Sequence, residues 1–211
     1  MLKQMTEDKI FFQAGDVKIE GLLYNAPGEK GVVVTHPHPL YGGDMHNNVV
    51  ETIIEAYREK GYTTLRFNFR GMGRSTGNYD EGIGEQKDVR AALAYLTGMG
   101  KASVDLAGYS FGAWVNALGL KGLDQARRTV MVSPPVNFLD FSFLDYNEKI
   151  RLVIAASRDD IGPPGMIKEM IPVWNPDARL EIIQGADHFY WGKNGDIKRI
   201  IQEFLSTSIR N

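Results

Sequence analysis

The chain contains no cysteine, and its positive and negative charges nearly balance. Without cysteine there are no disulfides, no thiolate metal sites and no cysteine nucleophile, and this composition fits a reducing compartment. The 24 basic and 26 acidic side chains leave a formal net charge of −2. Such a balance provides neither a basic field for nucleic acid nor a polybasic face for an anionic membrane. We therefore expect a small-molecule partner, no nucleic acid and no membrane.

Long hydrophobic runs are also missing. No apolar stretch approaches the roughly 20 residues that a helix needs to cross a bilayer. Residues 1–9 are charged and have no continuous apolar core, so they do not resemble a secretory signal peptide. These absences predict a cytoplasmic protein. Nothing in the sequence sets its oligomeric state.

The remaining sequence has the profile of one globular domain spanning residues 1–211, of which 43% are hydrophobic. Residues 10–14 and 17–24 flank Gly15-Asp16 and predict a leading antiparallel hairpin. Six further strands are expected at 32–34, 62–68, 101–107, 129–132, 152–156 and 180–183, with helical patterns between them and after the last. This alternation predicts an α/β fold with a doubly wound, mostly parallel sheet of about eight strands and helices on both faces.

Ligands of such sheets bind beyond the carboxyl ends of the strands. Several residues capable of chemistry directly follow predicted strands, so the fold should gather them at one edge: His36, His38, Arg70, Ser110, Asp159 and His188. Of these, Ser110 lies in the pentapeptide Gly108-Tyr109-Ser110-Phe111-Gly112, between a predicted strand and a predicted helix. A serine on so sharp a turn needs small neighbours two positions away, and glycine fits on both sides. This context identifies Ser110 as the candidate nucleophile of a nucleophile elbow.

A serine hydroxyl is a weak nucleophile near neutral pH. A histidine must take its proton, and a carboxylate must hold that histidine in the correct tautomer. The chain offers these groups in the order Ser110, Asp159 and His188. Asp160 competes with Asp159 for the role of the acid, and Asp187, which adjoins His188, is expected to stabilise its own loop.

With these motifs the sequence resembles the α/β-hydrolase superfamily over nearly its whole length. The segment 67–75 is similar to the loop after the fourth strand in that superfamily, and 185–189 is similar to its histidine loop. The order nucleophile, acid, histidine is the one these enzymes use. The spacing of the acid from the strand end and from Pro163 favours Asp159 over Asp160 by this resemblance.

The run Thr35-His36-Pro37-His38-Pro39-Leu40-Tyr41-Gly42-Gly43 resembles small, uncapped bacterial serine hydrolases related to the dienelactone hydrolase group. Dienelactone hydrolases proper use cysteine where this chain has Ser110, a departure that speaks against lactone chemistry of that kind. The resemblance implies an oxyanion hole made by the backbone N–H groups of Phe111 and His38. Because the two prolines have no N–H to give, His38 and Leu40 are the local candidates for the second donor.

His36, His38 and His46 lie close together in sequence and raise the alternative of a metal site. The prolines hold His36 and His38 in an extended segment that directs their side chains to opposite sides, so we expect no metal and no cofactor. His36 should be buried and hydrogen bonded, and His46 should be exposed or line the pocket. The candidate pocket residues are the aromatic side chains on the site loops: Tyr41, Phe138, Phe141 and Trp191.

Only residues 133–151 separate the strand before the acid from the preceding strand, which leaves room for a short flap but no helical cap. An open site favours small or extended acyl substrates. The sequence therefore predicts a serine hydrolase that cleaves a carboxylic ester or thioester through an acyl-enzyme, with lactones and small amides left open. The alternative is a non-catalytic binding or scaffold protein that keeps the hydrolase fold.

Overall fold

The structure, a computed structural model, describes residues 6–207. The strands in this range are β1 (Asp8–Ala14), β2 (Val17–Tyr24), β3 (Lys30–Thr35), β4 (Thr63–Phe67), β5 (Ser103–Tyr109), β6 (Ala126–Val132), β7 (Ile150–Ala156) and β8 (Arg179–Ile183). The helices are α1 (Asn48–Arg58), α2 (Ile83–Gly98), α3 (Phe111–Gly119), α4 (Pro164–Trp174) and α5 (Asn194–Thr207), with short 3₁₀ helices η1 (Pro39–Tyr41) and η2 (Leu120–Gly122).

All eight strands form one sheet in the order β1-β2-β4-β3-β5-β6-β7-β8. β1 pairs antiparallel with β2, and β2 pairs antiparallel with β4, whereas every following pair in the sheet, from β4·β3 to β7·β8, is parallel. The structure thus confirms the doubly wound, mostly parallel sheet. Its strand order reverses between β3 and β5, the kind of position where such sheets bind ligands beyond their carboxyl ends.

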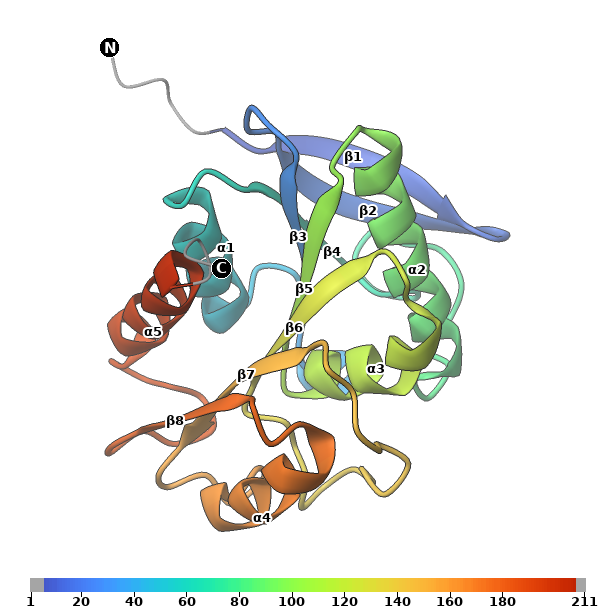
Figure 1. The fold of residues 1–211 in the computed structure, drawn as a ribbon. Coiled ribbons are helices and arrows are strands. Elements are labelled where there is room, and N and C mark those ends of the chain that lie inside the picture. Colours follow the sequence, from blue (N-terminus) through green and yellow to red (C-terminus); the bar gives the residue numbers. More distant parts are fainter. Residues whose placement is uncertain (1–5, 208–211) are drawn as a thin grey trace.

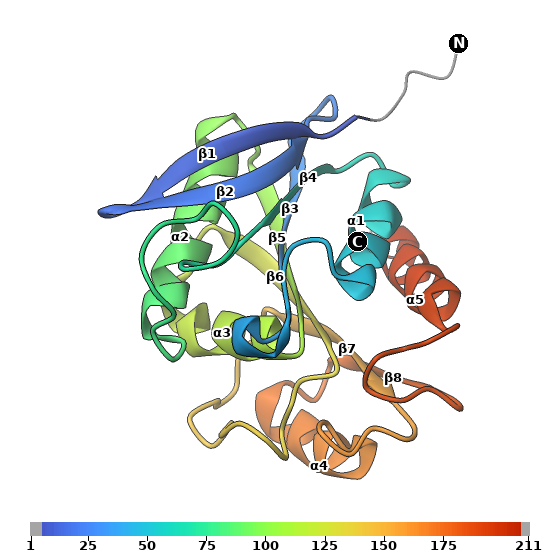
Figure 2. The ribbon, with the colours of Figure 1, turned by 180° about the vertical axis from the view of Figure 1, so that it is seen from behind.

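Helices cover both faces of the sheet (Figures 1 and 2), with α1 and α5 on one face and α2, α3 and α4 on the other. The central strands have apolar side chains on both faces, and these side chains pack against the two helical layers. In β3, Val32 and Val34 pack under α1 and α5, while Val33 packs toward α2. Strands buried on both faces need apolar residues throughout, which explains the unbroken apolar runs in their sequences.

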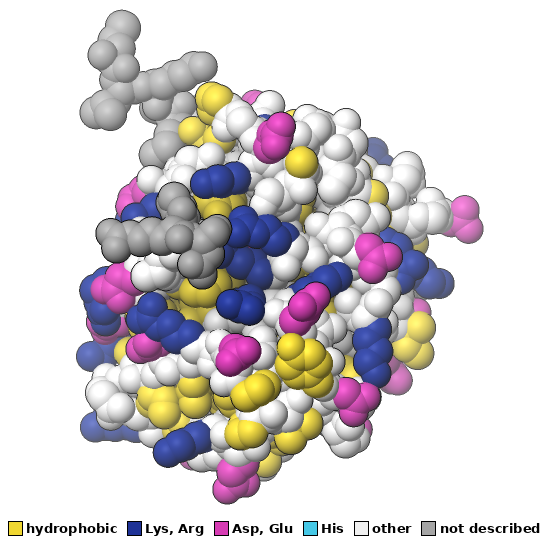
Figure 3. Space-filling view, viewed as in Figure 1, with side chains coloured by type: hydrophobic (Ala, Val, Ile, Leu, Met, Phe, Trp, Pro, Cys, Tyr) yellow, Lys and Arg dark blue, Asp and Glu magenta, His cyan; other side chains and the backbone are white. Residues whose placement is uncertain are grey.

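Helices α1 and α5 lie side by side on their face (Figure 1), and their contact is mainly apolar. Exposed ion pairs from Lys198 to Glu55 and Glu59 add to it, but such surface pairs contribute at most ~1 kcal/mol each. Acidic and basic side chains both occur across the surface visible in Figure 3. Within residues 6–207, no helix is both long enough and apolar enough to span a bilayer.

The segment between β6 and β7 and the helix that follows β7 have features that bear on the predicted absence of a cap and on the core. Residues 133–149, between β6 and β7, consist of turns and loop without a helix, so no cap covers the site. Helix α4 runs from Pro164 to Trp174 and contains Pro172 in its last turn. A proline so close to the end of a helix removes only one hydrogen bond of the last turn, and Trp174 gains burial in the core below.

Candidate active site

Ser110 lies at the junction of β5 and α3 in a strained backbone conformation, with φ of 53° and ψ of −120°. Its neighbours explain why the motif requires glycine. A Cβ atom at Gly108 would come within 2.6 Å of the Thr35 hydroxyl, and one at Gly112 would come equally close to the Thr35 carbonyl oxygen. The turn therefore packs its backbone directly against the end of β3 and directs the Ser110 side chain toward the edge of the sheet.

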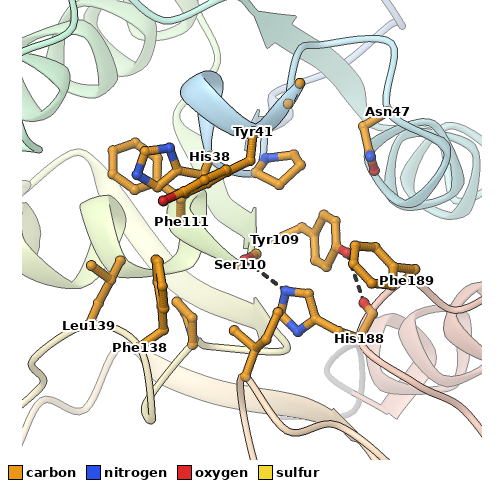
Figure 4. Close-up of a pocket in the computed structure, with 15 residues that line it drawn as sticks. His38, Tyr41, Asn47, Tyr109, Ser110, Phe111, Phe138, Leu139, His188 and Phe189 are labelled. Atoms are coloured by element: carbon orange, nitrogen blue, oxygen red, sulfur yellow. Dashed lines mark hydrogen bonds between the residues drawn. The ribbon is translucent and has the colours of Figure 1, made fainter.

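A chain of two hydrogen bonds joins Ser110 to a histidine and a carboxylate (Figure 4 shows the first). The Ser110 Oγ and His188 Nε2 are 2.9 Å apart, and His188 Nδ1 lies 2.8 Å from Asp159 Oδ2. A carboxylate can only accept, so Nδ1 carries the proton and Nε2 is free to accept the hydroxyl proton of Ser110. All three side chains are buried. The edge of the sheet thus brings together the three residues that the sequence singled out.

Four donors surround the carboxylate of Asp159. The Ile161 and Gly162 N–H groups donate to Oδ1 at 2.9 and 2.8 Å, and the Ser133 hydroxyl and His188 donate to Oδ2 at 2.7 and 2.8 Å. Burial on its own would raise the pKa of Asp159, but His188 and these donors outweigh it and hold that pKa below its usual range. Asp159 is thereby kept ionised and fixed in orientation.

Sequence reasoning missed the residues that support this acid. Ser133 is fully buried directly after β6, with an unusual φ of 42°. Because its proton goes to Asp159, its oxygen accepts the hydroxyl of Tyr190 at 2.8 Å. Tyr190 is also fully buried and has a φ of 56°, and burial raises its pKa, so it stays a neutral donor. Ser133 could have been found as another polar residue at a strand end, whereas Tyr190 carries no such signal.

The other two acids near the site play different parts. Asp187 accepts the N–H of Phe189 at 3.0 Å and so stabilises the turn that carries His188, as its sequence position suggested. The Tyr109 hydroxyl donates to the His188 carbonyl oxygen at 2.8 Å and holds the same turn from β5. Asp160 is exposed, and its side chain takes no part in the hydrogen bonds of the described chain.

The loop after β3 brings backbone N–H groups to the same edge. Among the hydrogen bonds of residues 6–207, none uses the N–H of Phe111 or that of His38. The N–H of Leu40, the other local candidate, donates to His38 Nδ1 at 3.3 Å and is therefore occupied. Phe111 and His38 are neighbours, with ring centroids 4.7 Å apart.

Two neutral histidines hold this loop in place. The Phe69 N–H donates to His36 Nε2 at 3.0 Å, so Nδ1 carries the proton and donates to the Pro37 carbonyl oxygen at 2.6 Å. Burial lowers the pKa of His36 to about 4. His38 accepts at Nδ1 and therefore donates from Nε2 to the Tyr79 hydroxyl at 3.3 Å, and burial lowers its pKa as well.

His36 is buried and hydrogen bonded, as expected, and the side chain of His46 is exposed. Within the described chain, no group of three histidine, aspartate or glutamate side chains is arranged to hold a metal ion. The histidines of this loop act on its backbone instead.

A pocket of about 520 Å³ opens over Ser110 (Figure 4). Tyr41 and Phe138 line it, as the sequence suggested, and their rings meet edge to face at 6.0 Å. Further lining residues that sequence reasoning did not single out include Asn47, Leu139, Ile161 and Phe189.

Phe141 and Trp191 were expected in this pocket, and that expectation is wrong for both. Phe141 is buried in the core, where its ring lies 5.3 Å from that of Trp174. Trp191 is 77% exposed and contributes nothing to the lining, because the turn after His188 directs Phe189 into the pocket instead. Position on a site loop was too coarse a criterion, since each loop turns some of its aromatic side chains inward to the core or outward to solvent.

Comparisons with known proteins agree with this architecture. The sequence pattern of the "Alpha/beta hydrolase family" matches residues 32–190. A protein of Rickettsia prowazekii (strain Madrid E), named as uncharacterised, is 34% identical, with 94% of this chain and 89% of that protein covered.

Among solved structures, an alpha-beta serine hydrolase homologue from Coxiella burnetii superposes with a TM-score of 0.88 at 30% identity, covering 96% of this chain and 99% of the other. A serine hydrolase without a lid from Xanthomonas campestris gives a TM-score of 0.87 at 28% identity, covering 98% and 97%. Fold, strand order and sequence pattern lead to the same conclusion: the chain belongs to the α/β-hydrolase family.

Proposed function

We propose that the protein is a serine hydrolase of the carboxylesterase or thioesterase type, with Ser110 as nucleophile, His188 as general base and acid, and Asp159 as the group that orients His188. The observation that carries this proposal is the chain of short hydrogen bonds from Ser110 through His188 to Asp159 at the floor of an open pocket. This arrangement matches the need of a serine for a base and of that base for an orienting carboxylate.

In the acylation step, His188 Nε2 takes the proton of Ser110 while Oγ attacks the carbonyl carbon of the substrate. The negative charge that develops on the carbonyl oxygen accepts hydrogen bonds from the N–H groups of Phe111 and His38, which have no other partner in the described chain. When the tetrahedral intermediate collapses, His188 returns the proton to the departing alcohol or thiol. An acyl group then remains bound to Ser110.

In the deacylation step, His188 takes a proton from water, whose oxygen attacks the acyl carbon. The second tetrahedral intermediate releases the carboxylic acid, and Ser110 regains its proton from His188. Throughout both steps, the ionised carboxylate of Asp159 stabilises the imidazolium form of His188. The lowered pKa of Asp159 supports this role, since the carboxylate stays charged well below neutral pH.

The pocket supports a small, uncharged and largely apolar substrate. Its lining consists of aromatic, aliphatic and small residues besides Asn47 and the proposed catalytic groups, and the described part of the chain contributes no Lys, Arg, Asp or Glu to it. A charged substrate group would lose its hydration there without a partner of opposite charge. Because the triad acts on the acyl carbon, esters and thioesters of the same acyl group should both react.

The test is covalent labelling by a fluorophosphonate, with the modified residue identified by mass spectrometry. We expect the label on Ser110 of the wild-type protein and turnover of short p-nitrophenyl esters and acyl thioesters. Ser110→Ala should remove both, whereas Ser142→Ala, a change at an exposed serine outside the pocket, should keep both. A folded wild-type protein that is neither labelled nor active would instead support a binding or scaffold role.

A further inference from the structure

The pocket has two arms of different chemistry, one on each side of Ser110. Figure 4 shows Phe138 and Leu139 on one side and Asn47 and Phe189 on the other. The first arm is lined by the apolar side chains of Phe138 and Leu139. The second is set apart by the side-chain amide of Asn47. An ester has two substituents that leave its carbonyl carbon in different directions, and two arms offer a separate environment for each of them.

The orientation of the Asn47 amide is fixed by the helix that follows it. Asn47 is the N-cap of α1, and its Oδ1 accepts the N–H of Val49 at 2.9 Å. Since an N–H group needs an oxygen opposite it, Nδ2 must occupy the other amide position. Asn47 is half-buried, and Nδ2 takes part in no hydrogen bond within residues 6–207. The second arm therefore presents an oriented donor without a partner.

The charges around the pocket decide what kind of group this donor takes. Among residues 6–207, no lysine or arginine side chain lines the pocket. Burial and the negative charges of Asp159 and Asp187 raise the pKa of Tyr109, which lines the pocket beside Ser110. A negatively charged substrate group would be repelled and would have no ion-pair partner. A neutral oxygen has no such cost and completes the hydrogen bond of Asn47.

We propose that the Asn47 arm is a subsite for a neutral hydrogen-bond acceptor, such as an ether, carbonyl or hydroxyl oxygen, in one substituent of the substrate ester, while the Phe138 arm takes an apolar substituent. This inference rests on the proposed hydrolase function and adds the substrate class to it. Asn47 is then a specificity-determining residue, because it contacts the substrate away from the reacting atoms.

Matched substrate pairs test the subsite on either substituent. On the acyl side, p-nitrophenyl 4-methoxybutyrate is compared with p-nitrophenyl hexanoate, which has the same chain length with carbon in place of oxygen. On the alcohol side, 2-methoxyethyl acetate is compared with butyl acetate. The quantity of interest is the ratio of kcat/KM within each pair, from which the intrinsic reactivity of the ester largely cancels.

In the wild-type protein we expect one of the two pairs to favour the ether by about threefold to tenfold, the range of a neutral hydrogen bond. Asn47→Ser keeps an oxygen that can cap α1 but removes the amide donor, so this preference should disappear. Asn47→Asp keeps the cap and replaces the donor with a charged acceptor, so the ether should become the poorer substrate. Asn48→Ser is the matched control, because Asn48 donates to Asn194 and does not line the pocket; its ratio should equal that of the wild type.

The outcomes separate the subsite from the function on which it rests. If the hydrocarbon esters are cleaved and Ser110 is labelled, but neither pair favours the ether or the preference survives in Asn47→Ser, the subsite proposal is overturned alone. Faster cleavage of the carboxylate-ended mono-p-nitrophenyl glutarate than of the hexanoate would overturn its restriction to neutral groups. If the wild-type protein is neither labelled nor active, the hydrolase proposal itself fails and the subsite fails with it.

Discussion

Two strand ends that meet at the site hold their functional residues in different ways. At the end of β5, Ser110 is fixed by the backbone, since Gly108 and Gly112 let a strained turn pack directly against β3. At the end of β7, Asp159 is fixed by contacts with four donors, two of which come from other parts of the chain. The backbone restraint on Ser110 follows from a local sequence motif. The hydrogen bonds that restrain Asp159 form only once the chain has folded.

The loop after β3, which carries the proposed oxyanion donor His38, belongs to the contact-held kind. His36 ties it to Phe69, and His38 ties it to Tyr79, so both anchors lie in the loop that follows β4. Backbone-held and contact-held residues should therefore respond differently to substitution and to pH. Substitutions should disturb backbone-held residues by steric strain and contact-held residues by the loss of hydrogen bonds.

The largest effect is expected at the contact-held acid. Asp159→Asn leaves a side chain of the same shape but favours the wrong tautomer of His188, so kcat should fall by about 10⁴. Asp160→Asn, at the exposed neighbour, should change kcat by less than about twofold. Steady-state kinetics on a p-nitrophenyl ester, with circular dichroism to verify folding, decide between them. The opposite ranking would assign the acid to Asp160.

Acid should destabilise the loop after β3 through His36. Burial lowers the pKa of this residue to about 4, against about 6.5 in the unfolded chain, so the unfolded state binds its proton more readily. The free energy of unfolding should therefore fall as the pH drops from about 6.5 to about 4, by up to ~3 kcal/mol from this residue. Urea unfolding at a series of pH values measures the fall.

A matched pair of variants isolates this effect from other titrating groups. In His36→Gln the slope of the free energy of unfolding against pH should decrease between about pH 4 and 6.5, by up to the contribution of one bound proton. In His46→Gln, where an exposed histidine is lost, the slope should stay as in the wild type. Equal slopes in wild type and His36→Gln would show that His36 does not resist protonation in the folded protein.

The same distinction explains how much could be predicted from the sequence. The apolar runs, the helical stripes and the turn at Gly15-Asp16 predicted all eight strands and the doubly wound sheet, because burial on both faces imposes an apolar pattern on the central strands. Ser110 and His188 could be located because each lies in a recognisable motif, Ser110 directly after β5 and His188 in the loop that follows β8. These are properties of short segments, which can be recognised in a sequence without knowledge of the tertiary contacts.

Contacts between distant segments were out of reach. Tyr190 supports Asp159 only through Ser133, which is 57 positions away in the chain. The pocket aromatics were half wrong for a related reason, since the inward or outward direction of Phe141 and Trp191 depends on how each loop turns. The role of Asn47 needed both the start of α1 and the position of the pocket.

The backbone-held side is tested at Gly112. In Gly112→Ala the added Cβ would lie 2.6 Å from the Thr35 carbonyl oxygen, so the elbow or the end of β3 must move. We expect a loss of about 1–3 kcal/mol in the free energy of unfolding and the disappearance of fluorophosphonate labelling. Gly165→Ala is the control, because a Cβ there meets no atom within 4 Å and the site lies in helix α4. An active and equally stable Gly112→Ala would mean that the elbow tolerates a side chain.

The smallest effect separates the two kinds of restraint within one residue, because Ser133 carries both a hydroxyl that holds Asp159 and a strained backbone with φ of 42°. Ser133→Ala and Ser133→Gly both remove the hydroxyl, so each should lower kcat by about tenfold with little change in KM, the loss of one hydrogen bond to a charged group. Only glycine relieves the backbone, so Ser133→Gly should be more stable than Ser133→Ala by about 1 kcal/mol. If the two variants have the same kcat, below that of the wild type, but differ in stability, the hydroxyl positions the acid and the backbone strain affects only the stability of the fold. If instead kcat recovered in Ser133→Gly along with stability, the hydroxyl would have no part in positioning Asp159, and the backbone alone would set the geometry at both strand ends.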